Sequence, residues 1–125
     1  MRLILDSGAL IALERGERLI WRRWSDAIAA GEPPICHGGI VGQVWRGGAR
    51  QARLARVLRY VDVRPLDSAL GRAAGALLSR VRQKDVIDAA LVLLAEDGDR
   101  IITSDPEDLA PLARAADLDV ELVRP

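Results

Sequence analysis

Short apolar runs alternate with longer amphipathic segments along the whole chain. The apolar runs predict buried strands, at residues 3–5, 35–36, 61–63, 101–103 and 120–123. Between them, apolar positions at three- and four-residue spacing predict helices, at residues 7–14, 17–30, 38–45, 51–58, 66–81, 85–95 and 106–115. This alternation is typical of a parallel sheet covered by helices on both faces. We therefore expect an α/β fold with three layers, α/β/α, and a short, mainly parallel sheet.

Several residues predict where these elements begin and end. Ser7 is a candidate N-cap of the first helix, and Gly16 follows the last turn of that helix. Gly47-Gly48 interrupts the chain before the fourth helix, and Pro106 suits the first turn of the last helix. No repeat, low-complexity tract or linker divides the sequence, so we expect residues 1–125 to form a single domain.

Aspartates at the ends of apolar runs are the most informative polar positions. Asp6 follows the first predicted strand and Asp105 follows the fourth, while Asp85 and Asp88 open a helix that is apolar almost all round. Open parallel sheets bind ligands beyond the carboxyl ends of their strands. A carboxylate there is costly unless it meets water, a hydrogen-bond donor or a metal ion. We therefore expect one acidic pocket at one edge of the sheet, with Mg²⁺ or Mn²⁺ as its ligand.

Helix capping is the alternative explanation for each of these aspartates. Asp6, Asp85 and Asp105 each stand directly before a predicted helix, and Asp108 completes a pattern that resembles a capping box. Asp88 fits this explanation less well because it lies inside an apolar helix. Two metal ions that bridge a phosphate are the usual reason to gather three or four carboxylates. Four caps that converge on one edge are a weaker explanation than a shared ligand site.

Composition and charge narrow the classes of function. The 18 basic and 18 acidic side chains give zero net charge, so any nucleic-acid binding needs a local patch. Cys36 is the only cysteine and His37 the only histidine, which excludes an intrachain disulfide and a Cys/His zinc cluster. We interpret this adjacent pair as structural. The sequence has no signal-peptide pattern and no run of about 20 apolar residues, so we expect a cytoplasmic protein without a membrane segment.

Four motifs in a fixed order give the sequence a family resemblance. They are LILDSGAL at residues 3–10, GQVWRGG at 42–48, DVIDAA at 85–90 and TSDPEDL at 103–109. Together they resemble a PIN domain, specifically the VapC-like toxins of bacterial toxin–antitoxin pairs, and the resemblance covers the whole chain. It implies a Rossmann-like sandwich, RNA cleavage that depends on Mg²⁺ or Mn²⁺, a homodimer, and inhibition by a small VapB-like antitoxin.

The resemblance also implies a set of metal-binding residues. The first family acid matches Asp6, the third matches either Asp85 or Asp88, and the fourth matches Asp105 with Asp108 as an auxiliary ligand. Thr103 or Ser104 would form hydrogen bonds within this site. The sequence departs from the family at the second acid, where Gln43 replaces the usual Glu. Glutamine keeps an oxygen ligand but lacks the charge, which weakens metal affinity.

Arginines recur every three or four residues after the second motif. On one helix they would form a basic stripe, made of Arg46, Arg50, Arg53, Arg56 and Arg59. Such a stripe suits an RNA backbone or an acidic antitoxin segment, for which Arg46, Arg50 and Arg53 are the candidates. A solvated helix face explains the same pattern equally well.

Three hypotheses for the function follow. The first is a ribonuclease toxin that hydrolyses phosphodiester bonds with a metal-activated water and without a covalent intermediate. The second is a PIN-fold module that binds RNA or a partner and has weakened or lost nuclease activity, as Gln43 suggests. The third is a phosphotransfer receiver, which also gathers aspartates at strand ends. It is disfavoured because Lys84, the only lysine, directly precedes Asp85 instead of following a late strand.

Overall fold

The computed structural model describes residues 1–125 and contains a five-stranded sheet in the order β3-β2-β1-β4-β5. The strands are β1 (Leu3–Leu5), β2 (Ile35–His37), β3 (Asp62–Arg64), β4 (Arg100–Ile102) and β5 (Glu121–Val123). Every pair of neighbouring strands is parallel. The expected α/β class is therefore confirmed, and the sheet is parallel throughout.

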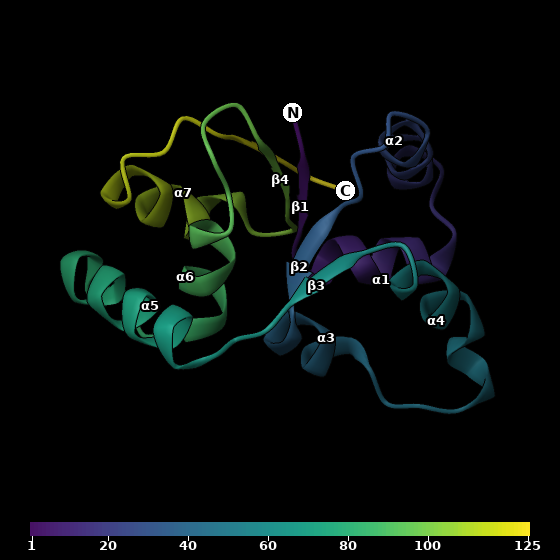
Figure 1. Cartoon of the computed structure of the whole chain (residues 1–125), viewed down its shortest axis with the longest axis horizontal. Helices are drawn as coiled ribbons and strands as arrows, with labels where there is room; N and C mark the ends of the chain where they lie inside the picture. Colours follow the sequence, from purple (N-terminus) through teal and green to yellow (C-terminus); the bar gives the residue numbers. More distant parts are fainter.

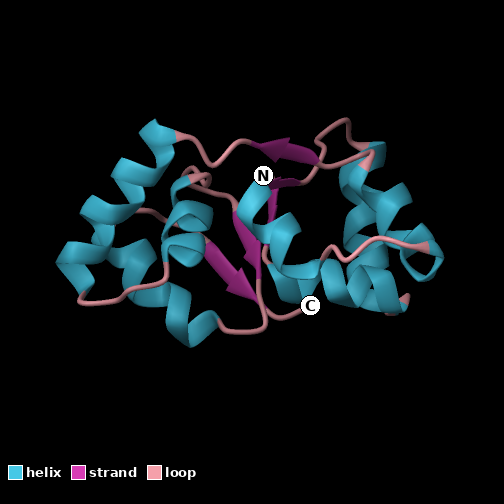
Figure 2. Cartoon of the chain, turned by 90° about the horizontal axis from the view of Figure 1, so that it is seen from below, coloured by secondary structure: helices cyan, strands magenta, loops and turns pink.

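Helices cover both faces of this sheet and complete the three layers. They are α1 (Ser7–Arg15), α2 (Arg18–Ala29), α3 (Gly38–Val44), α4 (Ala52–Leu58), α5 (Ser68–Val81), α6 (Val86–Leu93) and α7 (Pro106–Ala115). Figure 1 shows α1 to α4 on one side of the strands and α5 to α7 on the other, and Figure 2 shows the same separation from below. No helix is both long enough and apolar enough to cross a membrane.

The central strands are buried on both faces, which is why they read as unbroken apolar runs. Ile4 in β1 and Ile101 and Ile102 in β4 have no exposed surface. Helix α6 contributes four consecutive buried residues, Ala89 to Val92, because it packs against β2 and against both α5 and α7. Burial of one large aliphatic side chain contributes about 1.5–3 kcal/mol, so this core holds the strand ends in place.

Several helix ends differ by one or two residues from the sequence predictions, and three of the differences concern how a helix begins. Asp6, and not Ser7, is the N-cap of α1, because the Asp6 backbone is still extended and its carboxylate accepts the Ser7 N–H. Helix α5 begins at Ser68, two residues later than predicted, because the Asp67 carboxylate caps it by accepting the Leu70 N–H at 2.9 Å. The predicted helix at 51–58 starts with a 3-10 turn, Ala49–Gln51. Gly16 ends α1 in the left-handed conformation, as expected.

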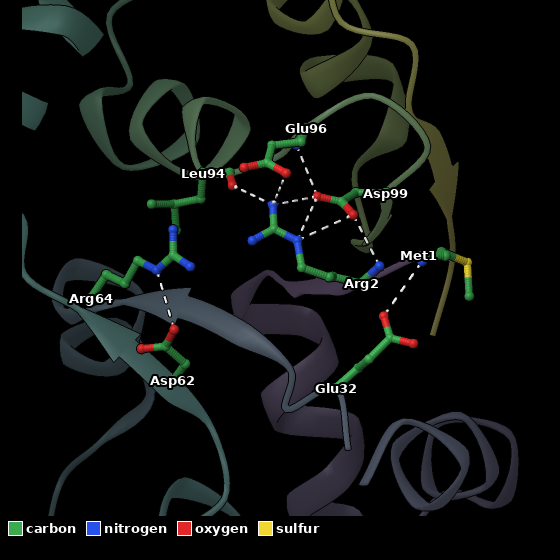
Figure 3. Close-up of polar contacts among 8 residues, drawn as sticks. All are labelled: Met1, Arg2, Glu32, Asp62, Arg64, Leu94, Glu96 and Asp99. Atoms are coloured by element: carbon green, nitrogen blue, oxygen red, sulfur yellow. Dashed lines mark hydrogen bonds and ion pairs between the residues drawn. The ribbon is translucent and has the colours of Figure 1, made fainter. Parts of the chain in front are cut away.

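A buried ion pair joins two segments at the amino edge of the sheet (Figure 3). The Asp99 carboxylate accepts hydrogen bonds from Arg2 Nη2 at 2.7 Å and from the backbone N–H groups of Arg2 and Glu96 at 2.9 and 2.8 Å. Burial by itself raises the pKa of Asp99, but these hydrogen bonds outweigh it and hold the pKa below its usual value. The pair ties the residue before β1 to the turn before β4.

Candidate functional site

The candidate site lies where the order of the strands reverses. The chain adds β2 and β3 to one side of β1, then crosses to add β4 and β5 on the other side. Asp6 follows β1 and Asp105 lies three residues beyond β4, so both belong to the carboxyl edge between these two strands. The Asp6 N–H donates to the Ile102 carbonyl at 3.0 Å, which fixes the two strand ends side by side. Open α/β sheets bind their ligands at such a point.

A chain of hydrogen bonds orients Asp6 at this edge. The Asp6 side chain is buried, and its Oδ1 accepts the Ser7 N–H at 2.7 Å. Its Oδ2 accepts the hydroxyl of the fully buried Thr103 at 2.6 Å. The same hydroxyl oxygen accepts the backbone N–H of Asp105 at 3.0 Å. One threonine therefore joins the two predicted aspartates, in agreement with the position expected for a hydrogen-bonding residue of the site.

Gly8 allows the first turn of α1 to approach the loop after β4. A Cβ atom at Gly8 would overlap Ser104 Oγ and would lie 2.9 Å from Ser104 Cβ and 3.2 Å from its backbone nitrogen. Real Cβ atoms do not approach other atoms so closely, so only glycine fits this position without displacement. Ser104 itself is exposed and, like Gly8, lies directly beside the aspartates.

Asp88 brings the third segment to the same edge. It lies in the first turn of α6, half-buried, where Asp85 is the N-cap and accepts the Asp88 N–H at 3.1 Å. Burial, together with the negative charges of Asp85, Asp6, Asp108 and Asp105, raises the pKa of Asp88 to about 7. The other four predicted carboxylates are thus near enough to act on Asp88, although the five residues come from three distant parts of the sequence.

These carboxylates suit a divalent cation by their chemistry but do not form a closed cage. No three His, Cys, Asp or Glu side chains converge closely enough to hold a metal ion. Asp105 and Asp108 are exposed, and the Asp105 side chain makes no capping hydrogen bond, so it can turn. A set of carboxylate oxygens prefers Mg²⁺ or Mn²⁺ over softer ions. A cation would also offset the burial and the neighbouring negative charges that raise the pKa of Asp88.

Gln43 lies in the last turn of α3 and is exposed. It comes four residues after Gly39, so the two positions share one face of the helix. A Cβ atom at Gly39 would lie 2.5 Å from Ile87 Cδ1, which shows that this face packs towards the first turn of α6. Gln43 therefore lies on the side of α3 that faces the Asp85–Asp88 segment, without a hydrogen bond to any of the carboxylates.

Cys36 and His37 have structural positions at the end of β2. Burial lowers the pKa of His37; its Nδ1 accepts the Gly39 N–H at 3.0 Å, and its Nε2 lies 3.0 Å from the Ile87 carbonyl oxygen. These contacts suit a neutral ring that donates from Nε2 and joins α3 to α6. Burial raises the pKa of the Cys36 thiol to about 12, so the thiol stays protonated. We therefore assign Cys36 and His37 a structural role beside the candidate site.

The expected arginine stripe on one helix is wrong for Arg46 and Arg50, whereas Arg53, Arg56 and Arg59 do lie along α4 and at its end. Gly47 and Gly48 both have positive φ angles, of 82° and 93°, and they break the chain between Arg46 and Arg50. Arg46 Nη1 donates to the Gly42 and Trp45 carbonyls at the end of α3, at 3.0 and 2.7 Å. Arg53 Nη1 donates to the Glu14 carbonyl in the last turn of α1, at 2.9 Å. The arginines at 46 and 53 therefore cap neighbouring helices.

Sequence reasoning missed Gln51, which shapes the loop before α4. Its side chain is 8% exposed, and its Oε1 accepts the N–H groups of Arg46 and Gly47 at 2.8 and 2.9 Å. Its Nε2 donates to the Val44 carbonyl at 2.9 Å. The only signal in the sequence is that Gln51 lies three residues before the buried Leu54. This spacing puts a polar residue in line with the apolar face of α4, directly before the helix begins.

Comparison with known proteins adds no relative to this picture. No family model matches the sequence, and no curated protein matches it significantly. The fold class follows from the parallel sheet and its two helical layers. The functional argument depends on the four sequence motifs and on the carboxylates at the edge between β1 and β4.

Proposed function

We propose that this protein is a metal-dependent endoribonuclease of the PIN type, acting in the cytoplasm as the toxin of a VapBC-like toxin–antitoxin pair. One observation carries the proposal. The negative charges of Asp6, Asp85, Asp105 and Asp108 all act on the half-buried Asp88, at the carboxyl edge where the strand order reverses. Such a gathering is costly in the folded protein unless a cation and a phosphate ester use it.

The residues of this edge have distinct roles in the proposal. Bound Mg²⁺ or Mn²⁺ would stabilise the charge of the phosphate and supply a water of lowered pKa. Asp6 is the rigid ligand, because Ser7 and Thr103 hold its carboxylate. Asp105 is the adjustable ligand, since its side chain is exposed and does not cap α7.

Asp88 is the better candidate for the third acid of the family. Asp85 Oδ1 already accepts the Asp88 N–H and caps α6, whereas the Asp88 carboxylate is the group on which all the other acids act. Asp85 is also exposed, while Asp88 is half-buried. We assign Asp88 as the ligand and Asp85 as the residue that fixes the start of α6.

A second candidate is a module that binds RNA or a protein partner and cleaves poorly. Two observations favour it. Gln43 offers a neutral amide where the family has a carboxylate, and no three acids converge at metal-binding distance. Both would reduce metal affinity and hence cleavage, while leaving the surface that binds a partner intact.

Calorimetric titration with Mn²⁺ and cleavage of a panel of RNAs separate these two candidates. We expect the wild-type protein to bind Mn²⁺ and to cleave, and Asp88→Asn and Asp105→Asn to lower Mn²⁺ affinity at least tenfold and to abolish cleavage. Asp117→Asn is the control, because Asp117 is an exposed aspartate beyond the far end of α7. Metal and RNA binding without cleavage would favour the binding module, and the absence of both would refute the nuclease.

The toxin role and the homodimer require separate measurements. Induced expression in bacterial cells should arrest growth, and Asp105→Asn should relieve the arrest if cleavage causes it. Sedimentation should give twice the monomer mass of 13.6 kDa if the protein is a dimer. Equal growth arrest by the wild type and by Asp105→Asn would show that toxicity does not come from the acidic edge.

A further inference from the structure

We propose that the hollow beside the acidic edge, between α1 and the segment that follows β5, binds the phosphate next to the scissile one in single-stranded RNA. This hollow has a volume of about 400 Å³, and its lining includes Gly8, Ile11, Arg15, Ser104 and Arg124. The inference rests on the proposed function and deepens it, because it assigns the neighbouring part of the substrate to particular residues. We call this hollow the phosphate hollow.

The phosphate hollow shares a wall with the acidic edge. Gly8 comes two residues after Asp6, and Ser104 directly precedes Asp105, so the close contact of Gly8 with Ser104 separates the two regions. The hollow lies on the α1 side of the edge, whereas Asp88 comes from α6 on the opposite side of the sheet. An RNA chain with one phosphate at Asp6 and Asp105 can therefore extend directly into the hollow.

Two arginines give the hollow the chemistry for a phosphate. Arg124 is already positioned, because its Nη1 donates to the Ser104 carbonyl at 2.5 Å and its Nη2 to Glu107 Oε1 at 2.8 Å. Arg15, in the last turn of α1, forms no ion pair and no side-chain hydrogen bond, so its guanidinium is free to bind. Guanidinium groups bind phosphate through two parallel hydrogen bonds. Glu17 is the only acidic side chain in the lining.

The remaining lining favours a nucleotide over an inorganic ion. Ile11 is 38% exposed on the outer face of α1, and together with Pro125 it offers an apolar surface beside the two cations. The volume of the hollow falls in the range of small-ligand pockets, about 300–1,000 Å³. A sugar and a base can cover the apolar part while the phosphate meets the arginines.

Charge explains why the occupant is RNA and not an acidic peptide. The edge beside the hollow gathers five aspartates, so an unattached anion has no reason to approach it. A phosphodiester bound at the edge by divalent cations brings the next phosphate with it through covalent connection. Arg15 then supplies a guanidinium without an ion-pair partner, and Arg124 supplies a second one whose charge is shared with Glu107.

The test is fluorescence anisotropy with a labelled single-stranded RNA oligonucleotide and the protein with its acidic edge unchanged. Ca²⁺ replaces Mn²⁺, because it also binds carboxylate oxygens but is not the metal of the proposed cleavage, so the probe is not consumed. Arg15→Gln and Arg124→Gln should each weaken RNA binding about five- to tenfold at low salt. Each should also reduce the slope of log affinity against log salt concentration by about one. Arg114→Gln, which removes an exposed arginine from the last turn of α7, should change neither value. Equal effects at all three positions, or no effect at Arg15, would overturn the proposal.

Two further measurements separate this proposal from the others. The Arg15 side chain forms no hydrogen bond or ion pair that the substitution would break. A folded Arg15→Gln variant therefore tests RNA binding in the hollow even if Arg124→Gln disturbs the loop at Ser104. Hydrolysis of bis(p-nitrophenyl) phosphate by the wild type tests the acidic edge alone, because this ester is too short to fill the hollow. Failure of that hydrolysis counts against the nuclease, while the anisotropy still decides on the hollow. Competition by polyglutamate as strong as that by RNA of equal charge would assign the hollow to an acidic protein segment and overturn the RNA assignment.

Discussion

Replacement of Asp88 by asparagine tests whether burial and the neighbouring acids destabilise the charged Asp88 carboxylate in the absence of metal. Burial and four neighbouring carboxylates raise the pKa of Asp88 in the folded protein from its ordinary value of 3.8 to about 7. Between these two values the folded state holds a proton that the unfolded state releases. The free energy of unfolding therefore falls as the pH rises through this window, and the cost is complete above pH 7.

The size of the effect follows from the shift. About three pKa units at 1.36 kcal/mol each set an upper bound of about 4 kcal/mol. Asp88 is only half-buried, so water screens part of this cost and we expect about 1–3 kcal/mol. Asp88→Asn keeps the shape of the side chain and removes its charge, and should raise the free energy of unfolding by that amount at pH 8. The corresponding rise in Tm is about 4–10 °C for a chain of this length.

Urea denaturation in EDTA, followed by tryptophan fluorescence, measures this difference. Trp24 is 7% exposed and its ring lies 6.1 Å from that of Trp21, so unfolding changes its surroundings strongly. The stabilisation by Asp88→Asn should shrink at pH 4.5, and added Mn²⁺ should stabilise the wild type more than the variant. Asp117→Asn serves as the control. A stability difference that is the same at pH 4.5 and pH 8, or none at pH 8, would refute the electrostatic reasoning.

Three other outcomes follow from the contacts described above. Asp99→Ala should cost about 3 kcal/mol at pH 7, since it leaves the N–H groups of Arg2 and Glu96 unpaired and removes the nearer of the two carboxylates that pair with the Arg2 guanidinium. Glu107→Ala, in an exposed pair, should cost less than about 0.5 kcal/mol. Folding lowers the pKa of Asp99, so its ionised carboxylate stabilises the folded state above the pKa of the unfolded chain, near pH 4. This stabilisation is lost as the pH falls through the lower pKa of the folded state. Urea denaturation at several pH values measures the loss. Gly8→Ala should lower the free energy of unfolding by about 1–3 kcal/mol and should weaken Mn²⁺ binding, measured by calorimetry. The additional substitution Ser104→Gly should restore both the stability and the Mn²⁺ affinity, because it removes the side chain that the new Cβ atom meets. A double variant no better than the single one would contradict the steric cause. Gln43→Glu should raise Mn²⁺ affinity and enlarge the Mn²⁺-dependent rise in Tm, and an unchanged rise would place position 43 outside the metal shell.

Much of the fold could be predicted because its signals are local. The strands β1 and β4 are buried on both faces, so apolar residues dominate both. Asp6 directly follows the last residue of β1, so the first polar residue marks the end of that strand. Helix α6 was predicted as buried because it is apolar almost all round. The shared edge of Asp6 and Asp105 followed from a general rule for parallel sheets.

The remaining features depend on contacts that no local pattern encodes. The ion pair of Arg2 with Asp99 joins residues 97 positions apart, and its two members look like ordinary surface charges in the sequence. The arginine stripe does not extend to Arg46 and Arg50, because the two glycines at 47 and 48 interrupt the helix, so regular spacing in the sequence does not put all five arginines on one helical face. The role of Gln51 depends on where the preceding loop carries its N–H groups.

The hydrogen bond between Thr103 and Asp6 has a consequence for synthesis of the protein. Because β4 pairs directly with β1, the carboxyl end of β1 is complete only after the ribosome has made β4, 97 residues later. A nascent chain that has reached only α6 carries Asp6 and Asp88 but has neither the threonine that orients the first nor the aspartate that follows it. The acidic edge therefore assembles only after residue 105 has been made, and a ribosome that stops before this point releases a fragment in which the edge is incomplete.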